Sequence, residues 1–286
     1  MNACNPLAAL MAVTAISLSA PGAAADERLA IFDTHVHYSR DAWAEYDPGA
    51  IVAALEAAKV VRALVSSTPD DGSLRLVDAD PDRFVAILRP YRTGIGPGNW
   101  FDDPDMPDYV ARRLERGGYL GIGEFHLFDA AAAETPQVRR LAAMAVARDI
   151  VLHVHGGTEP VRALFAIEPG LKILWAHAGM TTPPEVIGKL LDGHDRLSAE
   201  LSFRAADMAP EGRLDPAWRA LLVRHADRFM IGTDTYLPSR WEIYGALIDE
   251  HRRWLALLPP AVAEAIAHGN AARRFGAGPH RVPRLE

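Results

Sequence analysis

The stretch "IFDTHVHYSR", residues 31–40, decides the fold and holds the first evidence for a functional site. It is an apolar run that ends in two histidines, His35 and His37, with Asp33 two residues before the first. Alternate side chains of a β-strand point to the same face, so residues 33, 35 and 37 are expected to share one face. That face is either solvated or turned toward a site that needs nitrogen and oxygen ligands.

Similar apolar runs recur along the chain and alternate with segments of helix-forming composition. The runs, each a predicted strand, span residues 29–37, 61–67, 84–90, 119–125, 150–155, 171–179, 197–203 and 229–235. The clearest helical segments, each with proline close to its start, span residues 47–60, 135–149, 181–193 and 215–227. In the last three a threonine or aspartate before the proline is the predicted helix cap.

Strands that alternate with helices indicate parallel pairing, because helical crossovers connect parallel strands. Eight such units predict an α/β fold, a single-domain (β/α)8 TIM barrel over residues 26–276. The alternative is an open, doubly wound sheet. Against it, no G-x-G-x-x-G loop follows the first strand, so no dinucleotide site is indicated there.

The first 25 residues are predicted to form a secretory signal peptide. An uncharged apolar segment, residues 7–20, precedes Pro-Gly and then three alanines that offer a cleavage site. The segment is short for a bilayer span, so a periplasmic or secreted protein without a stable membrane anchor is expected. The absence of Lys and Arg before the segment is atypical, and a buried N-terminal helix is the alternative. Residues 277–286 are expected to be a disordered tail.

Composition narrows the classes of function. The chain has 286 residues and a net charge of −7, which disfavours a nucleic-acid-binding protein because phosphate neutralisation needs a basic surface. The only cysteine, Cys4, lies in the predicted signal peptide, so the mature chain has no thiolate ligand and no cysteine nucleophile. A small molecule is the expected partner, and the sequence does not indicate an oligomeric state.

Polar side chains occur at the ends of five predicted strands, where a (β/α)8 barrel places its active site. They are His35, His37, Glu124, His153, His155, His177 and Asp234. Taken singly, each has a simpler interpretation: Glu124 could pair with Arg89, and Asp234 could cap a helix. Together, buried imidazoles and carboxylates would be costly without a cation. One or two divalent ions are therefore predicted, zinc first, with Mn, Fe, Co or Ni as alternatives.

The ordered set resembles the amidohydrolase superfamily of metal-dependent hydrolases. The matching features are His-x-His on the first strand, a carboxylate on the fourth, histidines on the fifth and sixth, and aspartate on the eighth. The closing "AIAHGNAARRFG", residues 265–276, is similar to the helix that ends many members of the amidohydrolase-related branch. The resemblance covers roughly residues 29–276 and implies a TIM-barrel enzyme.

The resemblance implies a role for each ligand. His35 and His37 would bind the more buried metal together with Asp234, which would also be the catalytic proton acceptor. Glu124 takes the place of a bridging carboxylate, as in the deoxyribonuclease-like branch.

On the fifth and sixth strands, His153 and His177 would bind the second metal. With a single metal, His153 would join the first site and His177 would contact the substrate. His155 shares a face with His153, and either could be the ligand. The "VLH" context favours His153, which leaves His155 near the substrate.

The implied reaction is hydrolysis of a small-molecule amide, ester, lactone or phosphoester by activated water. The candidate substrate-binding residues are Arg89, His126, His155, Arg204 and Tyr236. The alternatives are a mononuclear-metal decarboxylase of the amidohydrolase-related branch, a nuclease of the deoxyribonuclease-like branch, and a metal-binding or solute-binding protein with an inactive site.

Overall fold

The computed structural model describes residue 1 and residues 29–276. Apart from Met1, the predicted signal peptide lies outside the described residues, and so does the predicted tail at residues 277–286. Within residues 29–276, every helix is too short or too polar to cross a membrane.

Parallel strands alternate with helices, which confirms the predicted α/β, (β/α)8 fold. In residues 29–276 the eight strands are β1 (Ile31–Val36), β2 (Val60–Ser66), β3 (Phe84–Ile87), β4 (Gly121–Leu127), β5 (Val151–Gly156), β6 (Lys172–Trp175), β7 (Leu197–Glu200) and β8 (Phe229–Met230). They pair in the orders β1-β2-β3 and β4-β5-β6-β7-β8. Strand order follows the chain without the reversal that defines a doubly wound sheet. Single parallel bridges, Leu88 with Ile122 and Asp33 with Ile231, link the two sheets.

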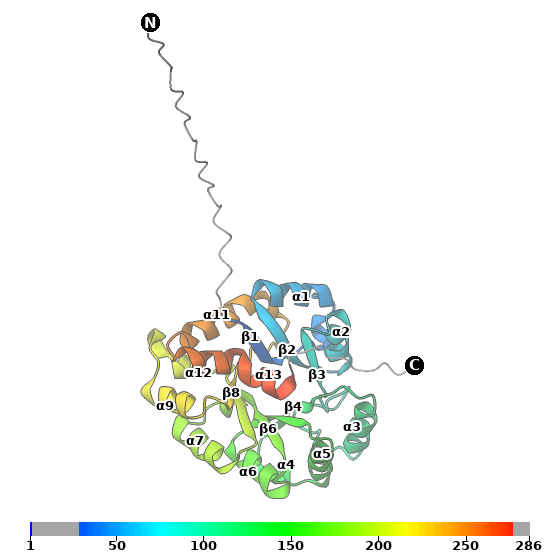
Figure 1. Cartoon of the computed structure of the whole chain (residues 1–286). Helices are drawn as coiled ribbons and strands as arrows, with labels where there is room; N and C mark the ends of the chain where they lie inside the picture. Colours follow the sequence, from blue (N-terminus) through cyan, green and yellow to red (C-terminus); the bar gives the residue numbers. More distant parts are fainter. Residues whose placement is uncertain (2–28, 277–286) are drawn as a thin grey trace.

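The helices surround the strands (Figure 1). They are α1 (Pro48–Ala57), α2 (Asp71–Ala79), α3 (Met106–Leu114), α4 (Ala130–Ala133), α5 (Pro136–Ala147), α6 (Thr158–Ile167), α7 (Pro184–Gly193), α8 (Ala205–Met208), α9 (Pro216–Arg224), α10 (Ser239–Glu242), α11 (Tyr244–Leu255), α12 (Pro260–Glu264) and α13 (Asn270–Phe275). A π-helical turn, Ala265–Gly269, joins α12 to α13. Figure 1 shows α13 crossing the centre of the view, over the strands.

Local sequence explains where several helices begin. The side chains of Asp47, Thr135 and Asp215 each accept a hydrogen bond from a backbone N–H in the first turn of α1, α5 and α9. A proline follows each of them, and its fixed φ is already suited to the first helical position. The threonine cap predicted for α7 is wrong. That helix begins at Pro184, and the hydroxyl of Thr182 instead donates to a backbone carbonyl of the preceding turn.

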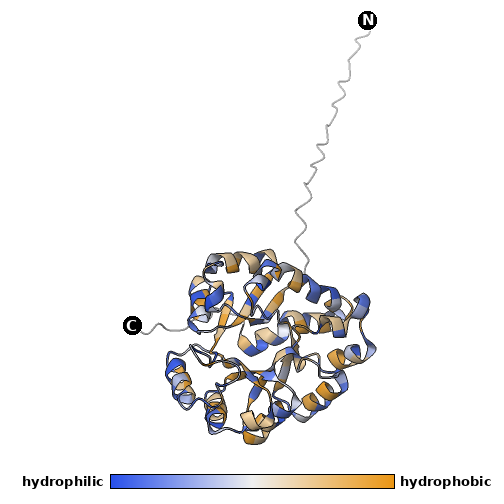
Figure 2. Cartoon of the chain, turned by 180° about the vertical axis from the view of Figure 1, so that it is seen from behind, coloured by the Kyte–Doolittle hydropathy of each residue, from blue (hydrophilic) through white to orange (hydrophobic). Residues whose placement is uncertain are grey.

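Apolar side chains fill two regions. The larger lies between strands and helices, where amphipathic helices alternate apolar and polar segments (Figure 2). The smaller joins residues of the strands to α13 and comprises Phe32, Leu64, Val85, Ile87, Val151, Leu174, Met230, Ala271 and Phe275. Because α13 covers the amino-terminal ends of the strands, where Asn270 donates to the carbonyl of Phe229 and Arg274 to Ser198 Oγ, the carboxyl end is left for polar side chains.

Four strands, β3, β6, β7 and β8, end at least three residues before the sequence predicts, and two of these changes affect the site. The runs 171–179 and 229–235 form strands only to Trp175 and Met230, so His177 and Asp234 lie in turns beyond them. Both adopt left-handed backbone conformations, with φ of 55° and 52°. Such values are uncommon outside glycine, and they turn these side chains away from the strand direction.

Asp215→Ala should lower the free energy of unfolding by about 1 kcal/mol, because it removes the cap of α9. Asp215 Oδ1 accepts from the backbone N–H groups of Ala217 and Trp218, at 2.9 and 3.0 Å. Urea denaturation followed by circular dichroism measures the change. Asp215→Asn keeps an acceptor and is the control; an alanine variant as stable as this control would contradict the capping role.

Candidate metal centre

The predicted ligands converge at the carboxyl ends of the strands. They meet at a pocket of about 450 Å³ that is lined by Arg89, Pro97, Glu124, His126, His155, His177, Met180, Phe203, Asp234 and Tyr236. His35 and His37 do not line the pocket. Both are buried, and their Nε2 atoms face the carboxylates of Glu124 and Asp234.

His35, on β1, and His37, just beyond the end of β1, face each other through their Nε2 atoms. His35 Nδ1 lies 3.0 Å from Glu200 Oε1, and His37 Nδ1 contacts the backbone carbonyl of Ser66. Because both partners are acceptors, each Nδ1 carries the ring hydrogen. The two Nε2 lone pairs then point toward each other across 3.1 Å. A cation at this position would remove the repulsion, so these residues fit a metal.

The surrounding carboxylates also favour a positive charge between the two rings. Burial alone would lower the pKa of His35, but the charges of Asp234, Glu124 and Glu200 outweigh it and raise that pKa well above its ordinary value. The position between the rings therefore attracts positive charge. Imidazole and carboxylate donors without thiolate suit first-row divalent metals.

Glu124 of β4 occupies the middle of the cluster. Its Oε2 lies 3.2 Å from His37 Nε2 and 3.5 Å from His35 Nε2, whereas its Oε1 lies 2.9 Å from His155 Nδ1. Each carboxylate oxygen thus faces a different set of imidazoles, which fits the bridging position expected from the resemblance. Arg89 also pairs with Oε2, at 3.1 Å, so the simpler interpretation of Glu124 as an ion-pair partner holds as well.

On β5 the structure brings His155 against Glu124 and His177, whereas His153 lies beside His35 and Glu200. His155 Nδ1 lies 3.2 Å from His177 Nε2, and His155 lines the pocket. His153 is buried below the pocket with its ring centroid 4.5 Å from that of His35, and neither of its ring nitrogens has a hydrogen-bond partner. The geometry therefore favours His155, which the sequence analysis had placed near the substrate.

Asp234 closes the cluster on the side of β8. Its Oδ1 lies 3.2 Å from His37 Nε2, and its Oδ2 lies 3.8 Å from His177 Nε2. Oδ1 is buried and accepts no hydrogen bond, as expected of an atom that has room for a metal. Burial raises the pKa of Asp234, but the neighbouring imidazoles of His35 and His37 hold it below its ordinary value.

Sequence reasoning missed Glu200, at the end of β7. Its carboxylate is fully buried, and its Oε1 accepts hydrogen bonds from His35 Nδ1 and from the backbone N–H of His177, at 3.0 and 2.5 Å. It therefore orients two candidate ligands at once. Gly232 packs against it so closely that a Cβ would lie 2.0 Å from Glu200 Oε2. The available signal was a lone carboxylate in the apolar run 197–203, the same signal that singled out Glu124.

Asp33 does not share a face with the two histidines, contrary to expectation. Its Oδ2 accepts hydrogen bonds from Thr233 Oγ1, at 2.6 Å, and from the hydroxyl of Tyr244 on α11, at 3.0 Å. The pairing of β1 with β2 is irregular after Asp33, which interrupts the strict alternation of side chains. Asp33 thus joins β1 to the segment after β8 and does not touch an imidazole ring.

Arg204, predicted to bind the substrate, is instead turned away from the pocket. Its guanidinium donates to the backbone carbonyls of His177, Ala178 and Thr182 and pairs with Asp207. The side chain is buried and does not line the pocket. Arg204 therefore holds the turn that carries His177 and is not directed at a substrate.

The other three substrate-binding candidates line the pocket. Arg89 donates to both the backbone carbonyl and the carboxylate of Glu124. The hydroxyl of Tyr91 lies 2.9 Å from His126 Nδ1, and burial lowers the pKa of His126 to about 3. Its neutral ring is stacked on that of His155, with centroids 4.1 Å apart. Tyr236 is half exposed at the mouth.

Comparison with known families identifies the class of protein. The sequence model of the amidohydrolase family matches residues 32–277, which is most of the chain. The chain belongs to this family and is an enzyme of the amidohydrolase superfamily. No curated protein sequence matches it.

Solved structures share the fold at low sequence identity. A putative 2-pyrone-4,6-dicarboxylic acid hydrolase from Pseudomonas putida is 20% identical, with a TM-score of 0.61 over 90% of this chain and 99% of that one. An amidohydrolase from Burkholderia multivorans with bound HEPES is 18% identical, with a TM-score of 0.58 over 87% and 99%. A TatD homologue from Escherichia coli is 16% identical, with a TM-score of 0.58 over 86% and 97%.

Glu200→Gln should weaken metal binding by roughly 10- to 100-fold, because the charge that holds the ring hydrogen of His35 is lost while the shape is kept. Competition with a coloured chelator measures the affinity. Glu185→Gln, at an exposed position on α7, is the matched control. Equal affinities of the two variants would show that Glu200 does not support the centre.

Proposed function

We propose that this protein is a hydrolase that activates water on two divalent metal ions, zinc first among them, to cleave a small-molecule ester, lactone, amide or phosphoester. The observation that carries the proposal is the pair of Nε2 lone pairs on His35 and His37. They face each other 3.1 Å apart, with both Nδ1 hydrogens committed elsewhere.

The geometry supports a division of the ligands between two ions. His35, His37 and Asp234 form one group of donors that lie within 4.8 Å of one another. His155 and His177 face the other oxygen of Glu124, at 2.9 and 3.7 Å. We assign Glu124 as the residue shared by both groups and His155 as the ligand from β5.

The chain's own residues supply the rest of the chemistry. Bound ions would lower the pKa of water and polarise the substrate oxygen. Asp234, whose Oδ1 accepts no hydrogen bond, takes the proton of the attacking water and returns it to the leaving group. Arg89 holds the carboxylate of Glu124 in place through its ion pair.

The pocket supports a small substrate with an apolar body. Met180, Phe203 and Tyr236 form apolar walls, whereas Arg89 and His126 supply polar groups. One of the similar structures is described as a pyrone dicarboxylic acid hydrolase. A cyclic ester that carries carboxylates fits a pocket of this composition, so lactones come first among the substrates to test.

Elemental analysis of purified protein should find two metal ions per chain, and His155→Asn should reduce this to one. His153→Asn is the matched control, since it changes the same residue type on the same strand and should leave the content at two. Circular dichroism confirms that each variant is folded. Loss of metal from the His153 variant alone would restore the assignment made from the sequence.

The purified enzyme should hydrolyse at least one member of a panel of lactones, esters, amides and phosphoesters. Removal of metal with a chelator should abolish the activity, and addition of zinc should restore it. Asp234→Asn should lower kcat by roughly 10²- to 10⁴-fold, because the proton acceptor is lost. Release of CO₂ without hydrolysis, or cleavage of DNA alone, would assign the enzyme to one of the alternative classes.

A further inference from the structure

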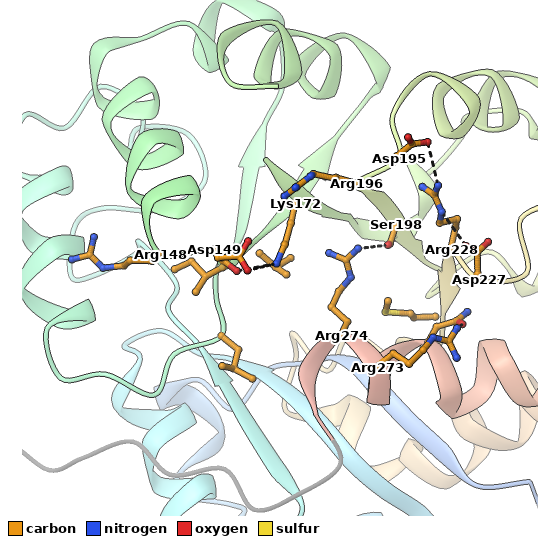
Figure 3. Close-up of a pocket in the computed structure, with 15 residues that line it drawn as sticks. Arg148, Asp149, Lys172, Asp195, Arg196, Ser198, Asp227, Arg228, Arg273 and Arg274 are labelled. Atoms are coloured by element: carbon orange, nitrogen blue, oxygen red, sulfur yellow. Dashed lines mark hydrogen bonds and ion pairs between the residues drawn. The ribbon is translucent and has the colours of Figure 1, made fainter. Parts of the chain in front are cut away.

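A second cavity, of about 550 Å³, lies at the opposite end of the strands from the metal centre. It is formed around the amino-terminal ends of β5 to β8, and α13 borders it (Figure 3). Val151 and Lys172 begin β5 and β6, and Arg274 comes from α13. None of its lining residues belongs to the pocket at the metal centre.

Positive charge is in excess around this cavity. The lining includes six basic side chains, namely Arg148, Lys172, Arg196, Arg228, Arg273 and Arg274, but only three carboxylates. Figure 3 shows Arg148 directed away from the others, whereas Lys172, Arg196 and Arg274 reach toward the middle. The basic side chains come from separate segments of the chain, so the fold is what gathers them.

The three carboxylates are already paired with two of these cations. Asp149 lies 2.7 Å from Lys172 Nζ, and Asp195 and Asp227 lie 3.6 and 3.4 Å from the guanidinium of Arg228. Within residues 29–276, neither Arg196 nor Arg274 forms an ion pair with a carboxylate.

Arg274 is the most constrained of the group. One terminal nitrogen donates to Ser198 Oγ at 3.0 Å, and the other is buried without a hydrogen-bond partner. Burial, together with the positive charges of Arg228 and Arg196, lowers the pKa of Arg274 below its ordinary value. A buried guanidinium nitrogen without an acceptor is costly, and an anion in the cavity would supply the acceptor.

We propose that this cavity binds a phosphate-bearing small molecule, whose phosphate group is held by Arg274 and Arg196. Arginine suits phosphate because its planar fork donates two parallel hydrogen bonds to adjacent oxygens. A phosphate dianion matches the combined charge of Arg274 and Arg196. Leu120, Val151 and Met230 line the same cavity and offer an apolar surface for the organic part of the ligand.

The position of the cavity indicates how a bound ligand would affect the protein. The amino-terminal face of a (β/α)8 barrel contributes to stability and is remote from the chemistry. A phosphate there would connect α13 with the start of β7, next to the contact between Arg274 and Ser198. Because the cavity exists only in the folded chain, the ligand stabilises the protein against unfolding.

Inorganic phosphate is the probe, added to the metal-loaded protein with potassium chloride at matched ionic strength as the salt control. Calorimetric titration gives the dissociation constant, and thermal unfolding gives the shift in Tm. Phosphate should raise Tm, whereas chloride should not. Arg274→Gln and Arg196→Gln should each raise the dissociation constant by about tenfold or more, since each removes a charged hydrogen-bond donor.

Two arginine variants serve as matched controls. Arg224→Gln removes an exposed arginine of α9 that pairs with Asp192 outside the cavity, and Arg89→Gln removes the arginine of the metal centre. Both should keep the response to phosphate. If Arg274→Gln fails to fold, Arg196→Gln alone decides. A shift in Tm that persists in both cavity variants, that disappears in Arg89→Gln, or that chloride reproduces would overturn the proposal.

Discussion

The repulsion between two nitrogen lone pairs is the constraint on which the rest of the site depends. Glu200 and Ser66 hold the ring hydrogens of His35 and His37, so neither ring can turn its other nitrogen to its neighbour. Only a positive charge relieves the contact. A cation also offsets the repulsion between the buried carboxylates of Glu124 and Asp234, which would otherwise oppose folding. The carboxyl ends of the strands are thus organised around a position that attracts positive charge.

Much of the fold and part of the site could be predicted from the sequence. Apolar runs that alternate with capped helical segments were sufficient for the (β/α)8 architecture, because a strand buried on both faces and a helix that follows it each leave a local pattern. The donor residues were found for the same reason, since a histidine or carboxylate at the end of an apolar run is conspicuous. Glu200 carried this signal too, and it was overlooked only because the resemblance assigns no ligand to the seventh strand.

The remaining features depend on contacts between residues far apart in the sequence. His153 and His155 are equivalent in a strand pattern, and the pairing of β5 with β4, which is irregular between Gly123 and Phe125, decides which ring meets Glu124. The role of Arg204 depends on the path of the turn after β6, where four consecutive residues from His177 have positive φ. The cavity beside α13 has no motif at all, because its basic side chains come from separate segments.

The join between β1 and β8 also brings the two ends of the sequence together at the site. Ile231 accepts a hydrogen bond from the backbone N–H of Thr34, and the backbone N–H of Asp234 donates to the carbonyl of His35. His35 and His37 therefore meet Asp234 only when segments about 200 residues apart in the sequence are brought together. A fragment of the chain that ends before β8 would carry the two histidines without this third donor, so the first group of ligands belongs to the closed pairing of the two ends of the fold and to neither end alone.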